Sequence, residues 1–338
     1  MRKLAFVILS VLFSGAAVGE TQEIMIGTIV PSHVAWAKEM LVASKEIGER
    51  TDGRIKLKFR FAQKSDAATL RNMRTRRFQG GMFTPGALQD QYPDITLYSL
   101  PLVFDSKEEA NFVRSRMDGK LMDGLNEAGF VSFGFSATGF AVLMSNEPVR
   151  SVADVKGKQV WVRAGDRISY SAMEALGVNP QPHPLGDVLV GLQTNLYDMI
   201  TVSPVGALVM QWHTKVEYLT EMPLAYTFGF LVIDKATFAK IEAQDQVIVR
   251  EVLTRVQAEF DKTGIEDDEK AKQVLFDAGI KAVIPGAAEL GEIRAILAEN
   301  NRKLAKQGEY SEDLYDEMMG YIDQYRSEHA KGDIVAAE

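Results

Sequence analysis

The chain has 338 residues, of which 46% are hydrophobic and 25% charged, and its formal net charge is −8. This acidic balance, with basic residues scattered along the chain, makes nucleic acid and anionic membrane surfaces poor candidate partners. The chain has no cysteine, which excludes disulfides, a lipid-bearing thiol and every thiol mechanism. Its length is sufficient for two domains with well-developed cores.

Residues 1–19 have the pattern of a secretory signal peptide. Arg2 and Lys3 precede an apolar run, and the small residues Ala17 and Gly19 then offer a cleavage site. The apolar run is too short for a transmembrane helix, which needs roughly 20 apolar residues. We therefore expect a mature protein that is exported to the periplasm.

The first part of the mature chain alternates between strand and helix patterns. We expect strands at 23–30, 54–61 and 80–83, and helices at about 33–50 and from Ser65 or Asp66 to about 78. Strands and helices in this order and spacing predict an α/β domain with a mainly parallel sheet.

The rest of the chain predicts a second lobe and several crossings between lobes. We expect a helix from Asp105 or Ser106, a glycine-interrupted strand run at 131–144, a second α/β unit at 156–225, a strand at 228–233, and helices near 243–277 and 287–328 around a short strand at 281–285. The run at 131–144 is suited to carry the chain between domains, and the strand at 228–233 to return to the first sheet. Repeated crossings of this kind make a hinge.

The lobe boundaries follow from these crossings. Lobe I is expected to comprise residues 20–141 and 227–265, and lobe II residues 142–226 and 266–330. The fold class is thus α/β with two lobes.

We find no signature of catalysis or of a metal or cofactor site. There is no Gly-x-Ser-x-Gly motif and no phosphate-binding loop, and the four histidines lack zinc-like spacing. The acidic run at 266–269 is interpreted as a solvated helix face. These observations predict a binding protein and not an enzyme.

Three motifs in the middle of the chain resemble those of one known family. They are SVADVKG at 151–157 before a strand, ALGVNP at 175–180, and GLQTN at 191–195 followed by Asp198. Further matches begin at Arg71 and include LPLVF at 100–104. In order and spacing these motifs are similar to the solute-binding subunits of TRAP transporters, the DctP-like family.

This resemblance implies a fold and a function. The fold would be that of a two-lobed periplasmic binding protein, with a long helix crossing both lobes. The function would be to capture a small-molecule ligand by lobe closure and to deliver it to a membrane permease of small and large subunits.

The strand after the Lys-Gly pair departs from the family pattern. Most members have an arginine four residues after the glycine, and it binds a substrate carboxylate through two parallel hydrogen bonds. Here the matching residue is Trp161. Arg163 lies two residues further along, shares the same strand face by alternation, and is the alternative anchor.

Two further positions of the family pattern are changed. A second arginine of some members falls at Ala141, and the frequent Asn-Pro after the later strand becomes Ser203-Pro204. A branch with Val-Trp-Val on the strand resembles this chain more closely. That likeness implies a more apolar ligand and, for some members, an additional periplasmic helical-repeat partner.

The candidate ligand-binding residues combine the family positions with the predicted strand ends. They are Trp161, Ser203, Phe83, Phe140, Thr84, Arg163, Ser32, His33 and Trp212. Each also has a structural explanation, such as a core position for Trp161 or helix capping for Ser32 and His33.

Two ligand hypotheses remain open. The ligand is either an organic acid held through Arg163, or a neutral or largely apolar molecule held by Trp161, Phe83 and Phe140. The alternative functions are a periplasmic ligand-sensing protein and a carrier of an apolar, lipid-like ligand.

Overall fold

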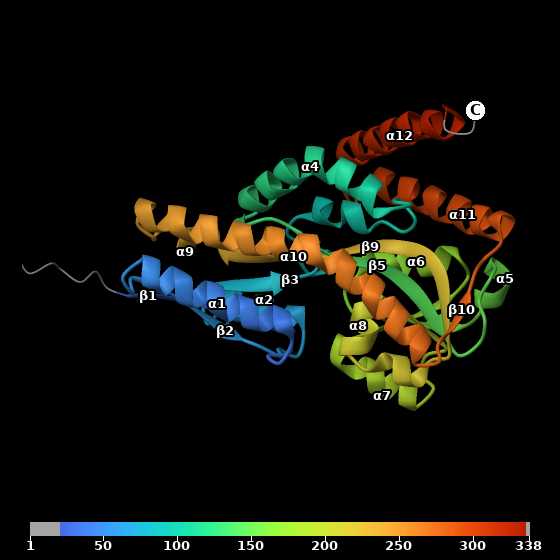
Figure 1. The fold of residues 1–338 in the computed structure, drawn as a ribbon, viewed down its shortest axis with the longest axis horizontal. Helices are drawn as coiled ribbons and strands as arrows, with labels where there is room; N and C mark the ends of the chain where they lie inside the picture. The colour runs from blue at the N-terminus through green and yellow to red at the C-terminus, as the bar shows by residue number, and fades with distance from the viewer. Residues whose placement is uncertain (1–20, 336–338) are drawn as a thin grey trace, which may run out of the picture.

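A ten-stranded mixed sheet runs through the two lobes of the computed structural model, which describes residues 21–335 (Figure 1). The strand order is β2-β1-β3-β9-β5-β8-β6-β7, with β10 and β4 paired to β9. The predicted signal peptide lies outside the described residues.

Lobe I is built on three parallel strands at one end of this sheet. Its elements are β1 (Gln22–Gly27), β2 (Ile55–Arg60), β3 (Gly80–Phe83), α1 (Ala35–Arg50) and α2 (Asp66–Arg74). The predicted capping of α2 is confirmed, because the Ser65 hydroxyl accepts from the backbone N–H of Ala68 over 3.1 Å. The helix ends earlier than predicted, since Arg76 adopts a left-handed φ of 57°.

Lobe II repeats the parallel arrangement at the other end. Its strands are β6 (Gln159–Arg163), β7 (Asn179–His183) and β8 (Met199–Val202). Its short helices are α5 (Val152–Val155), α6 (Arg167–Ala175), η2 (Leu185–Asp187), α7 (Val188–Gln193), α8 (Pro204–Val209) and η3 (Trp212–Lys215).

Three long elements pass through both lobes. They are β5 (Ser136–Ser145), β9 (Tyr218–Asp234) and the 35-residue helix α10 (Ala243–Asp277), which Figure 1 shows running from one lobe to the other. The predicted long helix is confirmed. The sheet is mixed and not mainly parallel, because β9 is antiparallel to both β3 and β5. The short strands β4 (Phe130–Ser132) and β10 (Lys281–Val283) pair with β9.

The region where β5 and β9 cross between lobes is irregular. The pairing of the two strands shifts register between Ala137 and Phe140 and again between Ala141 and Leu143. Gly139 lies in the first shift with a φ of 93°. Bulges of this kind bend a strand, so the crossing has the geometry of a hinge.

The remaining helices cover the sheet. They are α3 (Pro85–Leu88), η1 (Pro93–Ser99), α4 (Lys107–Glu127), α9 (Lys235–Phe238), α11 (Ala287–Lys306) and α12 (Glu312–Val335). The predicted helix at 287–328 is two helices, because the chain turns at Gly308 with a φ of 78°. Although the predicted boundary assigns this segment to lobe II, α12 packs on α4 in the core of lobe I.

A buried arginine ties these elements together where the lobes join. Arg114 of α4 donates to Asp261 of α10, to Asp118, to the Tyr226 hydroxyl and to the carbonyl of Phe135. It thereby links α4, α10, β9 and the residue that precedes β5. Because both carboxylates compensate its charge, it can remain buried.

Candidate functional site

Arg163 and Asp66 form an ion pair between the two lobes. Arg163 is the last residue of β6 in lobe II, and Asp66 is the first residue of α2 in lobe I. The Nη1 atom of Arg163 lies 2.8 Å from Oδ2 of Asp66. Asp66 is 7% exposed. The pair therefore lies near the carboxyl ends of the parallel strands of both lobes, where ligands bind in α/β folds.

Neighbouring residues bring the same two segments together. The side chain of Gln89 donates to the carbonyl of Gly165, and Arg167 pairs with Asp90 at 2.5 Å and with Glu309 at 2.8 Å. Ile168 of lobe II is buried in the core of lobe I. The lobes are thus in contact along the loop after β6.

Two buried polar side-chain atoms of α2 lack hydrogen-bond partners within the described chain. They are Oδ1 of Asp66 and Oγ1 of Thr69, one helical turn apart on α2. Burial raises the pKa of Asp66, and the charge of Arg163 opposes that rise. Both atoms have hydrogen-bonding capacity that a ligand can use.

Trp161 lies in the core of lobe II in this structure. It is 4% exposed, its indole N–H donates to the carbonyl of His183 over 3.0 Å, and its ring meets that of Trp212 edge-on at 5.2 Å. Trp212 is also buried. A ligand could contact Trp161 or Trp212 only if the residues that now cover their rings moved away. Contact of either tryptophan with the ligand therefore stays a prediction.

The candidates from lobe I and from the crossing differ in exposure. Phe83 is buried in the lobe I core, whereas Thr84 and Phe140 are half-buried. Phe140 meets the ring of Tyr226 edge-on at 5.4 Å. Phe140 and Thr84 are therefore more available to a ligand than Phe83.

The serine and histidine candidates occupy loops next to helix starts. Ser203 caps α8, with its hydroxyl accepting from the N–H of Gly206 over 3.3 Å. Ser32 and His33 are exposed in the loop before α1. The helix cap is Val34, so neither residue has the capping role considered from the sequence.

Asp268 of α10 is a buried carboxylate that the sequence did not single out. The acidic run at 266–269 was interpreted from the sequence as a solvated helix face, but Asp268 within it is buried. Its Oδ1 accepts from the N–H of Val205 over 3.0 Å, and its side chain lies against Gly139. Burial raises the pKa of Asp268 to about 7, although hydrogen bonds from the backbone N–H groups of Val205 and Phe140 act in the opposite direction and lower it. It connects α10 to the hinge and to the start of α8.

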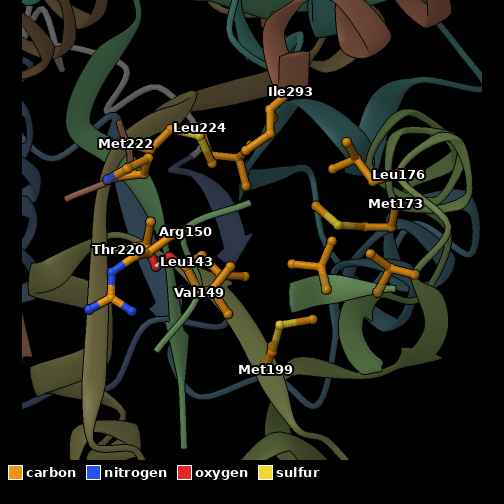
Figure 2. A pocket seen from close by; sticks show the side chains of 13 residues that line it. Leu143, Val149, Arg150, Met173, Leu176, Met199, Thr220, Met222, Leu224 and Ile293 are labelled. Carbon is orange, nitrogen blue, oxygen red and sulfur yellow. Dashed lines mark hydrogen bonds between the residues drawn. The ribbon is translucent and has the colours of Figure 1, made fainter. Parts of the chain in front are cut away.

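Lobe II also contains a small apolar cavity of about 30 Å³. Figure 2 shows Met173, Met199 and Met222 among the side chains that surround it. It is lined by residues of the sheet, α6 and α11, and lies on the opposite face of β6 from Trp161. Its size is close to that of one or two water molecules.

Within 21–335, no group of three or more acidic or histidine side chains is arranged to hold a metal ion. In that range, too, no helix combines the length and apolar character needed to cross a membrane.

Known proteins share both sequence and fold with this chain. A family model described as bacterial extracellular solute-binding protein, family 7 (DctP), matches residues 26–308. An uncharacterized protein of Haemophilus influenzae is 23% identical over 291 residues, which cover 82% of this chain and 85% of that protein.

Two further relatives have informative names. The 2,3-diketo-L-gulonate-binding periplasmic protein YiaO of Escherichia coli is 25% identical over 200 residues, which cover 56% of this chain and 58% of YiaO. The crystal structure of a TRAP periplasmic solute-binding protein from H. influenzae with bound L-gulonate matches with a TM-score of 0.81 at 18% identity. That match covers 89% of this chain and 99% of the other, and it establishes the likeness of fold.

Proposed function

Because its residues 26–308 match the family model, this chain belongs to the bacterial extracellular solute-binding protein family 7, and we propose that it captures a small organic solute between its lobes. It then delivers the solute to the small and large membrane subunits of a TRAP transporter. A periplasmic helical-repeat protein is a further proposed partner. A ligand-sensing protein is the less favoured alternative, because the family and the named relatives are solute-binding proteins.

The observation that carries this proposal is the ion pair between Arg163 and Asp66. It joins the end of β6 in lobe II to the start of α2 in lobe I. A solute that contacts both edges favours the closed arrangement of the lobes over the open one. The irregular crossing of β5 and β9 supplies the hinge for that movement.

Two ligand chemistries are compatible with these residues. The names of YiaO and of the gulonate-bound structure suggest a sugar acid, which the guanidinium of Arg163 would bind through its carboxylate. A neutral ligand would instead use Phe140, Thr84 and the unpartnered atoms of α2.

Native mass spectrometry of protein purified without denaturation tests the proposed function. We expect a fraction of the protein to carry one small molecule, which is released chemically unchanged on unfolding. Protein that has been unfolded, dialysed and refolded is the control, and it should take up the same compound from a cell extract. Failure of both samples to bind any compound, or conversion of the bound compound to a product, would contradict the proposal.

A further inference from the structure

The positive charge of Arg163 is already compensated in this structure. Its Nη1 atom lies 2.8 Å from Asp66, whose side chain is 8% exposed, while the arginine side chain is 24% exposed. Asp66 engages only Nη1, so a ligand carboxylate that bound the other N–H groups of Arg163 would lie beside Asp66. Two carboxylates would then lie close together in a poorly solvated place, which is unfavourable for both charges.

Asp66 and Thr69 present unused hydrogen-bonding capacity beside this pair. Oδ2 of Asp66 accepts from Arg163, but its Oδ1 atom has no partner in the described chain, and neither has Oγ1 of Thr69. An ionised carboxylate only accepts hydrogen bonds, whereas a hydroxyl both donates and accepts. The group that satisfies Asp66 must therefore be a donor, such as a hydroxyl or an N–H.

The two residues lie at the same place in lobe I. They are one helical turn apart on α2, and the methyl group of Thr69 lies over Gly27, the last residue of β1, and Gly81, the second residue of β3. Because Arg163 reaches Asp66 from lobe II, this cluster is part of the junction between the lobes.

On the basis of the proposed function, we propose that the ligand carries no carboxylate and donates a hydroxyl or N–H hydrogen bond to Asp66. The expected class is a neutral hydroxylated or amide-bearing molecule, with Thr69 as a second polar contact. In this arrangement Asp66 recognises the donor, and its negative charge disfavours an acid beside it. A donor on Oδ1 also stabilises the charged form that Arg163 requires.

The test uses a small-molecule extract of bacterial cells, separated by anion exchange into an anionic fraction and an unretained fraction. Ligand-free wild-type protein is incubated with each fraction, and bound masses are identified by native mass spectrometry. We expect binding from the unretained fraction. A carboxylate-bearing ligand from the anionic fraction would overturn the inference while leaving the proposed function intact. No binding from either fraction would contradict both.

Variants of the two residues sharpen this test. Asp66→Asn leaves Arg163 uncompensated, so it should gain ligands from the anionic fraction and bind the wild-type ligand at least tenfold more weakly. Asp245→Asn is the matched control, because Asp245 is also buried and paired with an arginine, Arg54, but within lobe I. It should keep the wild-type preference. Unchanged selectivity in Asp66→Asn would overturn the proposed exclusion of acids.

The variant Thr69→Val distinguishes a role of the Thr69 hydroxyl in ligand binding from a role in the stability of the fold. Because the hydroxyl lacks a partner in the ligand-free protein, its removal should leave the melting temperature of that protein unchanged or higher. The affinity for the ligand should fall several-fold. A lower melting temperature with unchanged affinity would show that the hydroxyl is structural and would overturn its role as a ligand contact.

Discussion

The indole N–H of Trp161 donates to the backbone carbonyl of His183, 3.0 Å away, and this bond connects the Trp161 side chain of β6 to the last residue of β7. The same carbonyl accepts from the N–H of Ala164 over 3.1 Å. His183 is therefore not left without a partner if the indole is replaced. The tryptophan side chain contributes to lobe II chiefly through its packing against Trp212 and its neighbours.

Replacement of Trp161 tests this packing role. Trp161→Ala should lower the free energy of unfolding by roughly 3–5 kcal/mol, the usual cost of removing a large buried aromatic side chain. Trp161→Phe should cost less, because most of the volume remains and the His183 carbonyl keeps its second donor. Urea denaturation measures both values. If Trp161→Ala weakened solute binding but kept the stability of the wild type, Trp161 would be a ligand contact and not a core residue.

The coupling between Arg163 and Asp66 is measurable by a double-mutant cycle. Arg163→Ala leaves the buried carboxylate of Asp66 without its cation, so this variant should lose roughly 1–3 kcal/mol of stability. Adding Asp66→Ala should recover part of that loss, because no unpaired buried charge then remains. Additive losses in thermal or chemical denaturation would mean that the pair contributes nothing to folding.

The pH dependence of stability should depend on Asp268. The pKa of the Asp268 carboxyl is about 7 in the folded protein, compared with an ordinary value of 3.8 for an aspartate. Between these values the folded protein keeps a proton that the unfolded chain has lost, so the contribution of Asp268 to stability falls as pH rises through this window. One such group changes the free energy of unfolding by at most about 1.4 kcal/mol per pH unit.

Asp268→Asn should remove this contribution. The difference in unfolding free energy between variant and wild type should therefore shift in favour of the variant between pH 4 and pH 7, and stay constant above pH 8. Other buried carboxyls titrate equally in both proteins, so the difference isolates Asp268. A pH-independent difference would contradict the raised pKa.

Gly139 should not tolerate a side chain. Its φ is 93°, and an added Cβ would collide with the carboxylate of Asp268. Gly157 has a similar φ of 77°, but nothing within 4 Å of an added Cβ. Gly157→Ala should thus show the cost of the left-handed backbone conformation alone, about 1–2 kcal/mol, while Gly139→Ala should cost more. Equal melting temperatures for the two variants would argue against close packing at the hinge.

Filling the apolar cavity of lobe II should stabilise the protein. Val178→Ile adds one methylene to the wall of this cavity and should raise the free energy of unfolding by about 0.5–1 kcal/mol. Val142→Ile is the control in the packed core around Trp161, where an added methylene should be unfavourable. A loss of stability in Val178→Ile would show that the cavity cannot accept the extra group.

Much of the fold could be predicted because its signals are local. Apolar periodicity predicted a helix at 243–277, which are the bounds of α10, and strand propensity predicted β3 at 80–83. The capping candidates at 65–66 and 105–106 marked the starts of α2 and α4, and the structure has Ser65 and Ser106 as the caps. Each of these signals depends on residues within one or two turns or strands, so they can be read without knowledge of the tertiary structure.

The candidate site was less predictable, because its properties depend on segments far apart in the chain. Alternation along β6 placed Trp161 and Arg163 on the same face, and this holds for a regular strand. It gave no information on what covers that face. The structure places Trp212 against the first residue and Asp66, 97 positions away, against the second.

The sequence by itself determined the α/β class, the order of the elements, the long helix and the resemblance to the family. The tertiary structure decided which polar groups are buried and paired: Arg163 with Asp66, and Asp268 with the start of α8. The reason is physical, since propensity and periodicity act over a few residues. Burial and the compensation of charge depend instead on which distant segments the fold brings within a few ångströms.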